Sequence, residues 1–167
     1  MIRHRTISVI GGSQVSTQIY QLAFELGREI AKRNFVLITG GRTGVMEAVS
    51  KGCQVAGGLS IGILPGDFKN EANNFVNVAI PTGLGEARNI IVVRAGDGII
   101  AVAAESGFGT LSELAFAQIL KKPLVILNGN ELIPEFLNTT SFHGVPQVGT
   151  PIEAVHQIET MLKIREK

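Results

Sequence analysis

Short apolar runs alternate with longer amphipathic stretches along most of this chain, and this alternation limits the fold more than any other feature. A run such as Thr6–Gly11 has the length of a buried strand, whereas Val15–Arg33 carries apolar residues at helical spacing. Strands that alternate with helices form βαβ units, whose right-handed crossovers place a mainly parallel sheet between two helical layers. We therefore expect a doubly wound, Rossmann-like, mainly parallel α/β fold, with residues 1–167 forming a single domain.

The same pattern predicts the individual elements. We expect strands at Thr6–Gly11, Phe35–Thr39, Leu59–Leu64, Phe75–Ile80, Gly98–Ala103, Leu124–Leu127 and Pro146–Val148. We expect helices at Val15–Arg33 (with Ser13 as its N-cap), Val45–Val55, Gly83–Ala95, Thr110–Lys121, Glu131–Leu137 and Ile152–Arg165. In parallel sheets, ligands bind beyond the carboxyl ends of the strands, where the strand order reverses. We place that reversal between the first strand and the strand at 98–103.

Composition excludes several classes of function. The net charge is +1 and aromatic residues make up 5%, so we expect no binding to nucleic acid. Cys53 is the only cysteine, which leaves no intramolecular disulfide, and the three histidines have no metal-ligand spacing. Charged residues interrupt the most apolar stretch, Ile90–Ala104, and the N-terminus lacks the features of a signal peptide. We expect a cytoplasmic protein that does not enter membranes.

The balance of apolar and charged residues points to self-association. Mean hydropathy is +0.28, and only 17% of the residues are charged. So few charges leave apolar surface that a homo-oligomer would cover. We expect a dimer or a tetramer.

Glycine-rich segments follow three of the expected strands. Gly107, Gly109 and Thr110 stand between a central strand and a helix, where free backbone amides and the helix dipole favour a phosphate. The alternative is a tight turn with nothing bound. Thr110 and Glu113 also fit a capping box, whereas a Glu113 side chain outside such a box would face the ligand crevice.

Two further glycine segments resemble neither of the common nucleotide motifs. Gly40, Gly41 and Gly44 follow the second strand, but no Gly-Lys-Ser/Thr completes a Walker A loop. The first turn, Gly11-Gly12-Ser13, lacks the third glycine of the dinucleotide fingerprint. Arg88 either pairs with Glu86 and is solvated, or points its charge into the crevice. We count all of these glycines, together with Ser13, as candidate ligand-binding residues.

Two motifs in order resemble the Lonely Guy family of cytokinin riboside 5′-monophosphate phosphoribohydrolases, whose members are often mislabelled lysine decarboxylases. Gly40–Val49, with Ile61–Pro65 downstream, resembles the GGGxxGLMxAV and GVIP segments of that family. Ser106–Glu113 resembles the end of its PGGxGTxxE motif, and Arg88 falls where the family has its arginine. The ARN and GTLSE segments are most similar to the subgroup that contains the molybdenum cofactor carrier protein. The resemblance covers roughly residues 6–127.

The resemblance implies roles for individual residues. Glu113 matches the glutamate that assists cleavage of the N-glycosidic bond, and Arg88 matches the arginine that pairs with it and holds substrate. The sequence departs from the family where Glu105 and Ser106 replace Pro-Gly and Asn89 replaces lysine. Two hypotheses follow: hydrolysis of a nucleoside 5′-monophosphate, or non-catalytic binding of a nucleotide or of molybdenum cofactor. We expect a small phosphorylated ligand, no required cofactor, no metal site and no lysine decarboxylase activity.

Overall fold

A parallel sheet forms the centre of the molecule. The computed structural model describes residues 4–102, 107–127 and 142–164. Within them, a seven-stranded sheet has the order β4-β3-β2-β1-β5-β6-β7, and each neighbouring pair is parallel. The strands are β1 (Thr6–Gly11), β2 (Val36–Thr39), β3 (Ser60–Leu64), β4 (Val78–Pro81), β5 (Gly98–Val102), β6 (Leu124–Leu127) and β7 (Gln147–Val148). The expected α/β fold is confirmed.

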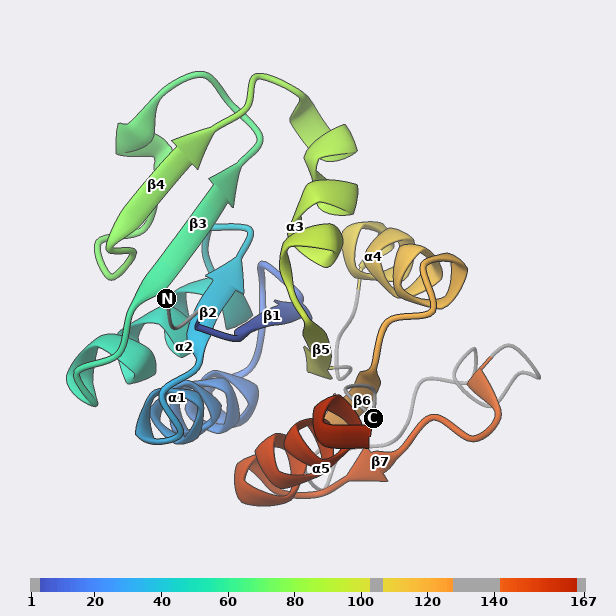
Figure 1. The fold of residues 1–167 in the computed structure, drawn as a ribbon. Helices are drawn as coiled ribbons and strands as arrows, with labels where there is room; N and C mark the ends of the chain where they lie inside the picture. Colours follow the sequence, from blue (N-terminus) through green and yellow to red (C-terminus); the bar gives the residue numbers. More distant parts are fainter. Residues whose placement is uncertain (1–3, 103–106, 128–141, 165–167) are drawn as a thin grey trace.

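Helices cover both faces of this sheet, as Figure 1 shows. The helices are α1 (Thr17–Lys32), α2 (Val45–Val55), α3 (Asn89–Ala95), α4 (Phe108–Ile119) and α5 (Pro151–Ile164), with 3-10 turns η1 (Lys69–Glu71) and η2 (Gly85–Arg88). One buried cluster joins α1, α2 and α5 to the sheet, and a second joins α3 and α4 to its other face. β1 pairs with both β2 and β5, so the strand order reverses between β1 and β5, as predicted.

Helices α1 and α2 approach each other more closely than side chains normally allow. Gly27 on α1 and Gly52 on α2 make this possible, because each lies directly against the backbone of the other helix. A Cβ at Gly52 would lie 2.8 Å from the carbonyl carbon of Phe24 and closer still to its oxygen. Cys53 is buried beside this contact, where burial raises the pKa of its thiol to about 11. That thiol is therefore a packing group and a poor nucleophile.

Two predicted helix starts are wrong. Ser16, rather than Ser13, is the N-cap of α1, and its side-chain oxygen accepts a hydrogen bond from the amide of Ile19. Helix α4 begins at Phe108 with Gly107 as N-cap, so Thr110 is already inside the helix and forms no capping box with Glu113. Both errors have the same cause, because each helix start offers two suitable N-cap residues. They are Ser13 and Ser16 for α1, and Gly107 and Thr110 for α4.

The remaining elements match the predictions closely, with small shifts. The single helix expected at Gly83–Ala95 is divided into η2 and α3, and the strand expected at Phe75–Ile80 begins later, at Val78. The helix predicted at Glu131–Leu137 lies outside the described residues, as do Glu105 and Ser106. Among the described helices, none is both long and apolar enough to cross a membrane.

Candidate functional site

A cavity of about 620 Å³ lies at the carboxyl end of the sheet, beside the reversal of strand order. Five segments far apart in the sequence meet there: the loop after β1, the loop after β2, the residue after β3, the η2–α3 junction and the start of α4. Hydrogen bonds hold the first two loops together, since Thr43 Oγ1 donates to the Ser13 carbonyl (3.0 Å) and the Val45 amide donates to the Gly12 carbonyl (3.0 Å). Parallel strands account for this convergence, because their carboxyl ends share one edge.

The start of α4 supplies backbone donors to the cavity. The first helical hydrogen bond runs from the Leu111 amide to the Gly107 carbonyl (3.1 Å), so the amides of residues 108–110 have no partner within the helix. Gly107, Gly109 and Thr110 all line the cavity. Unused amides and the positive end of the helix dipole make this wall attractive to an anion.

Arg88 supplies a buried cation to the same cavity. Its side chain is only 5% exposed, and among the described residues its Nε and Nη1 atoms have no hydrogen-bond partner. The guanidinium lies directly over Gly40, where a Cβ would come within 2.6 Å of Nη2 and closer to Nη1. Burial lowers the pKa of Arg88, while the nearby charge of Glu113 raises it. Burying a guanidinium whose N–H donors have no acceptor costs free energy of folding, unless a bound anion accepts those hydrogen bonds.

Glu113 faces the cavity from one turn further along α4. The carboxyl group is 7% exposed, and burial raises its pKa to about 8. The negative charge of Glu86 adds to this shift, while Arg88 opposes it. The cavity therefore holds an acid that is mainly protonated at neutral pH, next to a permanently charged guanidinium.

The structure brings most of the sequence-predicted site residues together. Those that line the cavity are Gly11, Gly12, Ser13, Arg88, Gly107, Gly109, Thr110 and Glu113. Gly40, Gly41 and Gly44 do not line it, and each has a packing reason to lack a side chain. Gly40 makes room for Arg88, Gly41 adopts φ +72° against Leu64, and Gly44 adopts φ +67° against the backbone of the β1–α1 loop.

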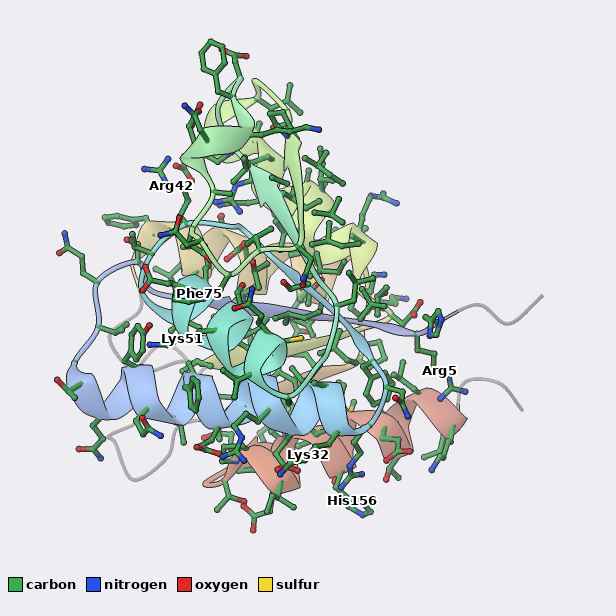
Figure 2. All side chains as sticks on the ribbon, turned by 90° about the vertical axis from the view of Figure 1, so that its left-hand side faces the viewer. Arg5, Lys32, Arg42, Lys51, Phe75 and His156 are labelled. Carbon is green, nitrogen blue, oxygen red and sulfur yellow. The ribbon has the colours of Figure 1, made fainter. Side chains whose placement is uncertain are left out.

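Several lining residues were not predicted as site residues. They are Gln14, Arg42, Thr43, Met46, Pro65, Glu86 and Asn89. Figure 2 shows the Arg42 side chain extending out from the body of the molecule, at the rim of the β2–α2 loop. Arg42, Thr43 and Asn89 lie in motifs that the sequence had already singled out, and their position next to a glycine or an arginine is the signal that could have found them. Across the described residues, no group of three or more histidine, cysteine or carboxylate side chains could hold a metal ion.

Comparison with known proteins now identifies the family. The SLOG cluster4 family matches residues 4–156 of the chain. The chain belongs to the SLOG cluster4 family. It is 31% identical to a probable cytokinin riboside 5′-monophosphate phosphoribohydrolase of Oryza sativa subsp. japonica, over 94% of this chain and 71% of that protein. The expected relation to the Lonely Guy superfamily is thus confirmed.

Solved structures relate this SLOG cluster4 member to molybdenum cofactor carriers. The molybdenum cofactor binding protein of Rippkaea orientalis superposes with a TM-score of 0.88 at 38% identity, covering 97% of this chain and 99% of that chain. The molybdenum cofactor carrier protein of Chlamydomonas reinhardtii gives a TM-score of 0.83 at 33% identity, covering 95% and 99%. The resemblance to the carrier subgroup, expected from the ARN and GTLSE segments, is confirmed.

Proposed function

We propose that this chain binds a phosphorylated, nucleotide-like ligand in the cavity and does so as a carrier. One observation carries the proposal: Arg88, whose Nε and Nη1 have no hydrogen-bond partner among the described residues, lines the same cavity as Gly109 and Thr110, whose amides have no partner within α4. A phosphate placed between them would complete both sets of donors, and charge-assisted hydrogen bonds of this kind are the strongest that proteins make. Arg42 at the rim adds a second positive charge for an anionic ligand.

Among such ligands, we propose the phosphorylated pterin of the molybdenum cofactor as the cargo. Two carriers or binders of that cofactor match nearly the full length of this chain. A cavity of about 620 Å³ has the size of a typical small-molecule site, which suits a tricyclic pterin as well as a nucleotide. The protonated Glu113 adds no negative charge that would repel a phosphate at neutral pH.

Ligand recovery and calorimetry together test this proposal. Protein purified from cells that make molybdenum cofactor is denatured and oxidised, and the released pterin is identified by fluorescence and mass spectrometry. Titration of the purified protein with inorganic phosphate and with AMP measures affinity directly. We expect Arg88→Gln to weaken phosphate binding by about tenfold or more, because it removes a charged donor.

Arg94→Gln is the matched control, since Arg94 lies on α3, directly after the η2 turn that ends at Arg88, is exposed and does not line the cavity. Equal phosphate affinity in wild type, Arg88→Gln and Arg94→Gln would overturn the proposed site. Recovery of a nucleotide in place of a pterin would keep the site and replace the cargo.

Hydrolysis of an N-glycosidic bond is the second candidate function, and the position of Glu113 favours it. The carboxyl group lines the cavity near Arg88. In the phosphoribohydrolases that the sequence resembles, the matching glutamate and arginine also form a pair. With a pKa of about 8 it suits a general acid that protonates the leaving base, rather than a general base that activates water. Incubation with a panel of nucleoside 5′-monophosphates decides the matter. No base release by wild type, or equal release by Glu113→Ala, rules this mechanism out.

We also propose that the chain self-associates through the outer face of α4. Glu113 is the one charged residue of this helix, and it is buried in the cavity. The exposed face instead carries Phe108 (90% exposed), Ala115 and Ile119 (73% exposed). A contiguous apolar patch on the exposed face of a helix is normally covered by a partner. We expect sedimentation to show an oligomer that Ile119→Lys dissociates, and a wild-type protein that sediments as a monomer at micromolar concentration would refute this.

A further inference from the structure

A buried asparagine connects the two walls of the cavity. Asn89 is the first residue of α3, directly after Arg88, and only 3% of it is exposed. Its Nδ2 donates to Ser112 Oγ across 3.0 Å and to the Gly109 carbonyl oxygen across 3.4 Å. Ser112 Oγ in turn donates to that same carbonyl across 2.7 Å. The hydrogen bonds therefore lead from Asn89 to the carbonyl of Gly109 by two routes, a long direct one and a shorter-bonded one through Ser112.

The end of this chain of hydrogen bonds is the peptide group that presents the Thr110 amide to the cavity. The carbonyl of Gly109 and the N–H of Thr110 belong to one planar, conjugated unit. A hydrogen bond to the carbonyl polarises the unit and makes its N–H a stronger donor, as in other hydrogen-bond chains. The Thr110 amide precedes the first helical hydrogen bond, so this donor strength is available to a ligand.

We propose that Asn89 is a positioning residue: acting directly and through Ser112, it orients and polarises the Gly109–Thr110 peptide so that the Thr110 amide binds the ligand phosphate. The proposal rests on the carrier function proposed above. The buried guanidinium of Arg88, whose Nε and Nη1 find no hydrogen-bond partner in the part of the chain that the structure describes, points independently to an anion in the same cavity. Arg88 and Asn89 are consecutive, so one junction sets the cation over Gly40 and braces the amide wall opposite.

This arrangement gives a reason for asparagine at position 89, where the resembling phosphoribohydrolases have lysine. A lysine would add a third positive charge to Arg42 and Arg88, whereas asparagine contributes through the neutral peptide. The cavity thereby retains donors for a phosphate without additional charge. Asn89 itself lines the cavity and places no charge in it.

The test uses full-length, 15N-labelled protein and inorganic phosphate as the probe. Ser112→Ala removes the hydroxyl that donates to the Gly109 carbonyl, and Ser112→Thr keeps that hydroxyl. Asn89→Ala removes the side-chain amide that donates to Ser112. Asn77→Ala is the matched control, because Asn77 also pairs with a serine (Ser60 Oγ donates to Asn77 Oδ1, 2.9 Å) but does not line the cavity. The readouts are the Thr110 amide resonance of the ligand-free protein and the dissociation constant for phosphate.

We expect Ser112→Ala and Asn89→Ala each to shift the Thr110 amide resonance and to weaken phosphate binding about fivefold, the effect of one hydrogen bond. The double variant should lose little more than either single variant, since both act through one carbonyl. Ser112→Thr keeps the hydroxyl and should restore the phosphate affinity that Ser112→Ala loses, whereas Asn77→Ala should leave both readouts unchanged, whatever it does to thermal stability.

An unchanged Thr110 resonance in Ser112→Ala overturns the proposal. If wild type binds phosphate, an unchanged phosphate affinity in Ser112→Ala or Asn89→Ala overturns it too. If wild type fails to bind phosphate, the carrier function fails, and the resonance of the ligand-free protein still decides the positioning role. Ser112→Ala alone suffices for both readouts should Asn89→Ala not fold.

Discussion

The pH dependence of folding measures how strongly the cavity disfavours a charged Glu113. Burial raises the pKa of this carboxyl from 4.5 to about 8. Above pH 4.5 the unfolded chain has released the proton, whereas the folded chain retains it up to about pH 8. Unfolding releases a proton throughout this window, so the free energy of unfolding falls as the pH rises. At about 1.4 kcal/mol for each pKa unit, the loss between pH 4.5 and 8 amounts to about 5 kcal/mol.

Glu113→Gln should remove this loss, because a neutral amide fills the same space without titrating. Urea unfolding followed by circular dichroism at pH 5, 6.5 and 8 gives the difference between wild type and variant, which cancels all other titrating groups. We expect the free energy of unfolding of Glu113→Gln, relative to that of wild type, to increase steadily as the pH rises. Phosphate affinity of wild type should also fall above pH 8, as Glu113 becomes charged.

Glu159→Gln is the control of opposite sign. A hydrogen bond from Lys163, assisted by another from Arg33, lowers the pKa of the Glu159 carboxyl. Its contribution to stability is present at neutral pH and is lost as the pH falls through the lowered pKa. Parallel unfolding curves for wild type and Glu113→Gln between pH 5 and 8 would refute our reasoning. They would mean that Arg88 keeps Glu113 ionised in the folded state.

Three further predictions concern packing and caps. Gly52→Ala should lower the free energy of unfolding by about 2–4 kcal/mol in urea, because the new methyl group meets the backbone carbonyl of Phe24. A smaller loss would show that α1 and α2 move apart easily. Ser16→Ala should cost about 1 kcal/mol and Ser13→Ala much less, since only Ser16 caps α1, and equal losses would contradict that assignment. Gly40→Ala should push the buried guanidinium into the cavity and weaken phosphate binding with little change in melting temperature, and unchanged phosphate affinity would contradict the contact.

The sequence predicted the order of strands and helices because the patterns that define them are local. Helix α2, for example, has the predicted bounds Val45–Val55, set by an apolar stripe with glycine before it and glycines after it. The reversal beside β1 also followed, because right-handed crossovers leave few arrangements of the strands. The start of α4 did not follow, because Phe108 stands between two glycines and Thr110 has the appearance of a cap.

The site was only partly predictable because its geometry depends on contacts between distant segments. The sequence predicted Gly40 as part of a ligand-binding loop. In the structure, its missing side chain makes room for the guanidinium of Arg88, the last residue of η2. Asn73, which donates to the Arg42 carbonyl across 2.8 Å, braces the β2–α2 loop from the segment after η1. Nothing local in the sequence indicates such a contact, since the partner is chosen by the folded sheet rather than by neighbouring residues.

The glycine contact between α1 and α2 also governs how the cavity can adapt. At Gly27 and Gly52 the two backbones meet directly, with no side chain between them to change rotamer, so we expect these helices to move as one rigid body. The loops that lead into them, cross-linked by Thr43 and Val45, are carried along as a fixed half of the cavity. Any accommodation of a larger or smaller cargo therefore falls to the opposite half, built from η2, α3 and α4.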